Sequence, residues 1–144
     1  MSQYKNILVA VDLSEDSTPV LQRARAFADV SGAELHLIHV IEPLSFAYGG
    51  DIPMDFSGIQ EEIQQQATQQ MLRFAESNGI DAQHQRIVLG KPEVEIHETA
   101  KELDTDLIVL GSHGRHGLAL LMGSTANGVM HGANCDVLAV RVGK

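Results

Sequence analysis

Short runs of apolar residues constrain the fold of this chain more than any other feature. Three of them, ILVAV, LIVL and VLAV, are apolar at every position. Strands that are apolar on both faces are typical of parallel sheets covered by helices on both sides. The pattern predicts five strands: Ile7–Val11, Glu34–Ile41, Gln83–Leu89, Leu107–Leu110 and Val137–Val142.

Segments with helical periodicity separate these runs. The first follows Asp12 and stops at Gly32, the second covers Ser57–Ser77, the third starts near Pro92, and the fourth near Ser124. The apolar stripes predicted for these helices are, in order, Val20, Leu21, Ala24, Phe27 and Ala28; Ile59, Ile63, Ala67, Met71 and Phe74; Val94, Ile96, Ala100 and Leu103; Ala126, Val129 and Met130.

The alternation of strand and helix predicts a doubly wound α/β fold. We expect a five-stranded parallel sheet in the order 3-2-1-4-5, with helices on both faces, in a single domain over residues 1–144. The one long irregular stretch is Glu42–Phe56, which is rich in glycine and proline.

Composition narrows the possible functions. The formal net charge is −9 over 144 residues, with 4% aromatic residues and no tryptophan, so nucleic-acid binding is not expected. A single cysteine, Cys135, allows no internal disulfide and favours a reducing compartment. No apolar run has the length of a signal peptide core or a membrane span, so we expect a cytoplasmic protein that does not enter membranes.

The predicted strand order places a ligand site where the first and fourth strands end side by side. Asp12 ends the first strand, and its carboxylate can bind a ribose or a base or simply cap the next helix. Val40, near the end of the second strand, can offer backbone groups and a methyl wall to adenine or serve only as core. A glycine-rich segment follows the fourth strand: Gly111, Gly114 and Gly117, then Gly123, Ser124 and Thr125.

This glycine-rich segment has two interpretations. Glycine amides, a helix N-terminus and two hydroxyls together make a phosphate cradle. Alternatively, the glycines only form turns and Ser124 only caps a helix. The segment is neither a Walker loop nor a Rossmann fingerprint.

The other chemistry-bearing residues suggest no catalytic or metal site. His113 and His116 stand three apart without a recognisable third ligand, so we expect no metal there. His36 and His39 are interpreted as hydrogen-bonded strand histidines. No nucleophile stands in a recognisable constellation, so we expect no catalytic residue.

Taken together, VAVDLSEDS, IHVIEP, LIVLGSHGRHGLALLMGSTANGV and CDVLAVRV resemble the universal stress protein family from Tyr4 to Val142. One branch of that family binds ATP through G-x2-G-x9-G-Ser/Thr. Here the spacer between Gly114 and Gly123 has eight residues rather than nine. The resemblance implies that Asp12 and Val40, with Ala10 nearby, contact adenosine. It also implies that ribose and phosphates contact Gly111, Gly114, Gly123, Ser124 and Thr125.

The expected function is therefore a stress-response module that binds ATP or another adenine nucleotide, with Mg²⁺ as a possible companion of the phosphates. Nucleotide occupancy would change the surface offered to partners. Two alternatives stay open: a nucleotide-independent dimeric interaction protein of the same fold, and a slow ATP hydrolase. We also expect a homodimer through the last strand, Val137–Val142, because a long apolar edge invites pairing.

Overall fold

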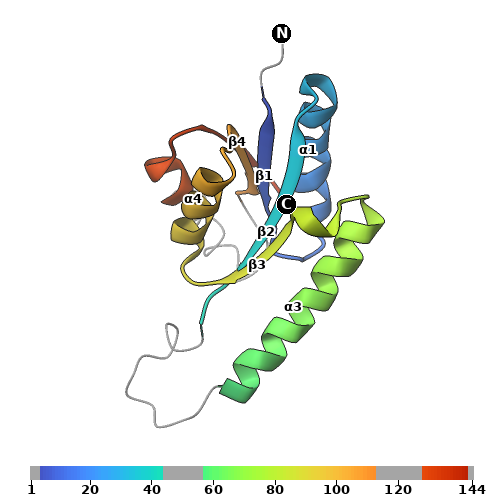
Figure 1. Cartoon of the computed structure of the whole chain (residues 1–144), viewed down its shortest axis with the longest axis vertical. Coiled ribbons are helices and arrows are strands. Elements are labelled where there is room, and N and C mark those ends of the chain that lie inside the picture. The colour runs from blue at the N-terminus through green and yellow to red at the C-terminus, as the bar shows by residue number, and fades with distance from the viewer. Residues whose placement is uncertain (1–3, 44–56, 113–127, 143–144) are drawn as a thin grey trace.

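The computed structural model describes residues 4–43, 57–112 and 128–142. Five parallel strands form one sheet in the order β3-β2-β1-β4-β5, which confirms the predicted topology (Figure 1). The strands are β1 (Asn6–Ala10), β2 (Glu34–Ile41), β3 (Gln85–Leu89), β4 (Leu107–Gly111) and β5 (Asp136–Val140).

Helices cover both faces of this sheet (Figure 1). The helices α1 (Ser17–Ser31) and α3 (Ser57–Ser77) lie on one face, and α4 (Pro92–Glu102) lies on the other, together with a helical segment over 128–132. A short 3-10 helix, η1 (Ala82–His84), leads into β3. Each face has its own core: Val9, Leu21 and Met71 belong to the α1/α3 layer, and Leu8, Ile38 and Ile96 belong to the α4 layer.

Local sequence explains where the helices begin and end. Gly32 ends α1 with a left-handed φ of 75°, and its N–H donates to the Ala28 carbonyl at 2.7 Å. Pro92 opens α4, where the missing N–H costs no helical hydrogen bond. Glu93 and Glu95 in the first turn and Lys101 in the last complement the helix dipole.

The structure corrects several details of the sequence prediction. Residues of the predicted apolar stripes are exposed where a helix runs past the sheet or turns a flank to solvent. The third strand begins at Gln85, because η1 occupies the two preceding residues. The strand predicted over Val137–Val142 covers Asp136–Val140. The proposed start of the fourth helix near Ser124 lies outside the described residues, as does most of Glu42–Phe56. The exposed stripe residues are Phe27 (38%), Ile59 (49%), Val94 (44%) and Met130 (47%).

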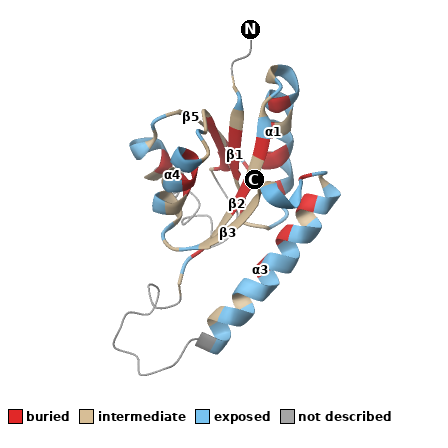
Figure 2. Ribbon diagram, viewed as in Figure 1, coloured by how far each residue is buried: buried red, intermediate tan, exposed pale blue. Residues whose placement is uncertain are grey.

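The long helix α3 shows most clearly that part of a predicted apolar stripe can be exposed. Figure 2 shows buried residues only in the half of α3 that begins at Ala67, whereas residues 58–66 are exposed or half-buried. Met71 and Ala75 pack into the α1/α3 core, and Ile59 does not reach it. The sheet is therefore too short to cover the first turns of α3.

Candidate functional site

A hollow of about 70 Å³ lies at the carboxyl end of the sheet, on the α4 face. It brings together Ala10 at the end of β1 and Val40 near the end of β2, with Asp12 from the turn that follows β1. These are three of the residues that the sequence predicts for nucleotide binding. The rest of the wall is mostly apolar and comes from Val11, Ile38, His39, Leu110, Pro92 and Ile96.

The backbone of Val40 faces the gap beyond the end of β1. The last bond between β1 and β2 runs from the Val11 N–H to the Ile38 carbonyl, at 2.9 Å. On the other side of β2, the Gly90 N–H donates to the Ile41 carbonyl at 3.0 Å. Because the direction alternates along a strand, the N–H and C=O of Val40 point the same way as those of Ile38. Among the described residues, nothing continues the β1 ladder to them, so they are open to a ligand.

The turn between β1 and α1 is organised around one oxygen of Asp12. Its Oδ1 accepts hydrogen bonds from the Ser14 N–H (2.9 Å), the Ser14 hydroxyl (2.6 Å) and the Ser17 hydroxyl (2.9 Å). Ser17 Oγ in turn accepts from the Leu13 N–H at 3.0 Å. All three of these hydrogen bonds to the carboxylate end on Oδ1, and none of them reaches Oδ2. One carboxylate oxygen therefore holds the turn, and the other is left for a ligand.

These hydrogen bonds also set the charge of Asp12. Burial alone would raise the pKa of its carboxyl group, but the hydrogen bonds from Ser14 and Ser17 outweigh that effect and lower the pKa below its ordinary value. Asp12 is therefore ionised at neutral pH and acts purely as a hydrogen-bond acceptor. The sequence left open whether Asp12 orders the turn or binds a ligand, and the geometry allows both at once.

The same turn contains backbone strain. Leu13 has a φ of 65°, in the left-handed region that a large side chain rarely adopts. Such strain persists only where surrounding contacts enforce it, and it clusters at functional sites. Here the contacts are the hydrogen bonds of Asp12 and Ser17, which fix the chain where it borders the hollow.

Gly111 plays a different part from the other described site residues. A side chain at this position would point into the α1 layer, where a Cβ would lie 3.3 Å from Val142 Cγ2 and 3.5 Å from Val20 Cγ2. Gly111 is buried at the end of β4 and does not line the hollow. Close packing thus favours glycine here, and any contact of Gly111 itself with a ligand would use its backbone.

The remaining predicted site residues, Gly114, Gly123, Ser124 and Thr125, lie outside the described residues, as do His113 and His116. Sequence reasoning missed the wall that α4 provides, Pro92 and Ile96. Pro92 stood out only as a helix start, and Ile96 only as part of an apolar stripe. Their place over the strand ends depends on how α4 packs across the sheet.

His39 confirms the interpretation as a hydrogen-bonded strand histidine. Its Nδ1 lies 2.8 Å from the Val11 carbonyl. A carbonyl oxygen can only accept, so Nδ1 carries the proton and donates it. This bond ties the end of β1 to β2 beside the hollow.

Comparison with known proteins identifies the family. The model of the universal stress protein family matches residues 3–141. This chain belongs to that family. It is 42% identical over 146 residues to universal stress protein A homolog 2 of Coxiella burnetii, covering 99% of this chain and 98% of that relative.

Solved structures of family members share the fold. UspA from Lactobacillus plantarum superposes with a TM-score of 0.72 at 26% identity, covering 98% of this chain and 100% of that one. A universal stress protein in complex with cAMP gives a TM-score of 0.61 at 26% identity, covering 96% and 98%. Within the described part of this universal stress protein, no helix has the length and apolar character needed to cross a membrane.

Proposed function

We propose that this universal stress protein binds an adenine nucleotide, ATP in the first instance, with the base in the hollow at the carboxyl end of the sheet. The observation that carries the proposal is the meeting of Ala10, Asp12 and Val40 around one hollow at the predicted position. Ligands of doubly wound sheets bind at this edge.

The chemistry of the hollow suits a nucleoside. Its largely apolar wall, including Ala10, Val40 and Ile96, offers contact to the faces of a purine. The open N–H and C=O of Val40 supply one donor and one acceptor for the edge of the base. The ionised Asp12, whose Oδ2 takes none of the hydrogen bonds from Ser14 and Ser17, accepts from a ribose hydroxyl or an amino group of the base.

The family supports the same reading. A relative of the same fold, 26% identical, forms a complex with cAMP, which is an adenine nucleotide. Phosphate binding rests on the sequence prediction for Gly111, Gly114, Gly123, Ser124 and Thr125, with Mg²⁺ as the phosphates' companion. We propose a cytoplasmic stress-response role as a binding and signalling module, in which nucleotide occupancy, not turnover, is the signal.

Nucleotide content and affinity test this proposal. Freshly purified protein is denatured and its released nucleotides are separated by chromatography, and the emptied protein is titrated with ATP, AMP and cAMP in a calorimeter. Ala10→Leu adds three carbon atoms to the hollow and should weaken ATP binding at least tenfold. Ala26→Leu, the same change at an exposed position of α1, should leave affinity within twofold.

The result of this titration distinguishes the nucleotide-binding function from the alternatives. ATP affinity that falls in Ala10→Leu and not in Ala26→Leu supports the hollow as the base site. No copurified nucleotide, together with no binding at millimolar ATP, would overturn the proposal. The nucleotide-independent interaction protein would then be the better reading, and multiple-turnover assays with Mg²⁺ separate a slow hydrolase from both.

We also propose that the protein forms a homodimer through β5. This strand lies at one edge of the sheet, and Val137, Leu138 and Ala139 are only half-buried. The unpaired edge of such a strand pairs readily with another strand. A two-fold axis would bring two copies of β5 together antiparallel.

A further inference from the structure

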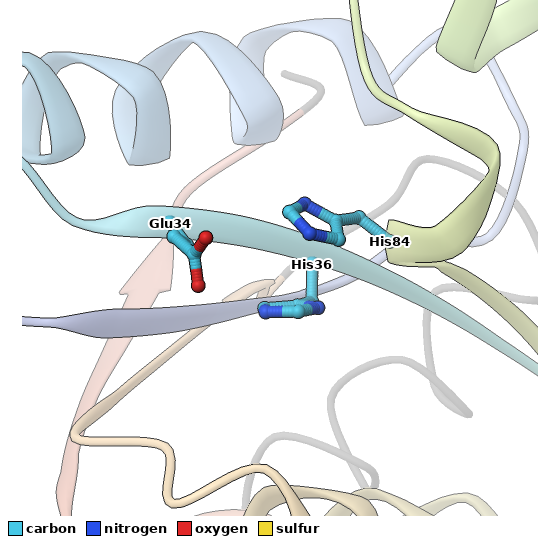
Figure 3. Close-up of side chains that lie close together, drawn as sticks. All are labelled: Glu34, His36 and His84. Carbon is cyan, nitrogen blue, oxygen red and sulfur yellow. The ribbon is translucent and has the colours of Figure 1, made fainter.

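Two histidines and a glutamate gather at the amino end of β2, on the α4 face of the sheet (Figure 3). Glu34 and His36 are two residues apart on the strand, so their side chains point to the same face. His84 ends η1, and the pairing of Leu37 with Gln85 places it beside His36 on the neighbouring chain segment. Figure 3 shows the three side chains side by side.

The distances suit a shared metal ion. One ligand atom from each of Glu34, His36 and His84 lies within 4.8 Å of the other two. The two imidazole rings have centroids 4.2 Å apart and are tilted by 38°. Zinc bound to nitrogen and oxygen at 2.0–2.2 Å needs ligand atoms about 3.3 Å apart in a tetrahedral site, so small side-chain rotations close the set. Within the described part of the chain, no other three such residues come so close.

The surroundings of Glu34, His36 and His84 are compatible with an ion bound from solvent. His36 and His84 are half-buried and Glu34 is exposed, so an ion can reach them from solvent. Arg86, the next residue on this face of β3, donates to Glu102 of α4, which offsets its positive charge. The charge of Arg86 is therefore paired, and an ion can approach the two imidazoles from solvent.

We propose that Glu34, His36 and His84 bind a divalent transition-metal ion, with Zn²⁺ the best match. Two imidazoles and one carboxylate are a common donor set for such ions. Three protein ligands leave a coordination position open to water or to a group from a partner. The ion would tie the start of β2 to the segment that leads into β3.

This site is separate from the nucleotide hollow. His36 and Val40 stand four residues apart on β2, about 13 Å along an extended strand. The hollow lies at the carboxyl end of the sheet and the metal ligands at the amino end. The proposed ion is therefore not the Mg²⁺ of a bound nucleotide, and it can be tested on nucleotide-free protein.

Zinc titration of the full chain tests the site. Calorimetry with ZnCl₂ on metal-free protein, at pH 7 in a non-chelating buffer, measures affinity and stoichiometry. His84→Ala and His36→Ala should each weaken this Zn²⁺ binding at least tenfold. The control is His131→Ala, which removes an exposed histidine from the helical segment over 128–132, outside the proposed ligand set. It should change the Zn²⁺ affinity less than twofold.

A second measurement locates the ion and guards against misfolding. Addition of Zn²⁺ should shift the backbone NMR signals of Glu34, His36 and His84. Glu34→Gln, at an exposed position, should weaken Zn²⁺ binding, while circular dichroism should show that the metal-free variant keeps its fold. Wild-type zinc affinity in Glu34→Gln and His84→Ala, or signal shifts confined to other histidines, would overturn the proposal.

Discussion

Asp12 holds the β1–α1 turn and is also a proposed ligand-binding residue, and its charge state makes the structural role measurable. Its Oδ1 holds the β1–α1 turn through three hydrogen bonds, and its pKa is lowered in the folded protein. A lowered folded pKa means that the ionised form stabilises the fold above the unfolded value of about 3.9. This stabilisation is lost as the pH falls through the folded pKa.

Asp12→Asn should therefore destabilise the protein at pH 7 and much less at low pH. Because the carboxylate is partly exposed, we expect a loss of about 1 kcal/mol in the free energy of unfolding at pH 7. Urea unfolding of both proteins between pH 7 and pH 3 measures the difference. Asp29→Asn, at an exposed position of α1, is the control. A difference between wild type and Asp12→Asn that stays constant with pH would contradict the assignment.

At the residue scale, the sequence predicted the residues that the strand ends contribute to the hollow but not those that α4 contributes. Asp12 and Val40 could be found because each stands at the end of a recognisable strand or next to it, whereas Ala10 followed from the family resemblance. Pro92 and Ile96 could not, since their contact with the hollow depends on the path of α4 across the sheet. His84 could not be linked to His36 either, because η1 replaced the expected start of the third strand and no motif spans the two.

At the scale of elements, periodicity predicted the helices but not how much of each is buried. The stripe of α3 continues from Ile59 to Phe74, yet only its later part reaches the core. Periodicity reports which face of a helix is apolar, whereas burial depends on the length of the sheet beneath it. The apolar strands were more informative, because a strand apolar on both faces must lie inside the sheet.

The two ends of α3 should respond very differently to substitution. Met71→Ala removes a side chain that is 1% exposed, and should cost about 2–5 kcal/mol in the free energy of unfolding. Ile59→Gln, at a side chain that is 49% exposed, should change it by about 0.5 kcal/mol or less. Urea unfolding of the two variants beside wild type provides the comparison. Equal losses would show that the first turns of α3 are covered in solution.

At the scale of the whole molecule, β2 connects the two proposed sites. Its carboxyl end borders the hollow through Val40, and its amino end carries Glu34 and His36, two of the proposed metal ligands. The strand lies inside the sheet between β1 and β3, so both sites are built on a well-supported element. The sheet has two outer strands, β3 and β5, and the one proposed to pair with another copy of the chain is β5.

The proposed dimer depends on backbone groups of β5 that can be removed selectively. The Ser112 N–H donates to the Val140 carbonyl at 2.9 Å, so Val140 directs its backbone groups towards β4. By alternation, Val137 and Ala139 direct theirs outwards, away from the sheet. Ala139→Pro therefore removes an outward N–H and leaves the bonds between β4 and β5 in place, because proline is tolerated where an edge strand faces away from its neighbour.

Light scattering after size exclusion should show a mass of about twice the 15.6 kDa of one chain for the wild-type protein. For Ala139→Pro it should show the mass of a monomer. Circular dichroism should show the same secondary structure in both. Leu138→Pro, whose N–H points towards β4, should instead disturb the fold, which separates an edge effect from a general effect of proline. A wild-type monomer would disprove the dimer, and a variant that stays dimeric and folded would place the interface on another surface.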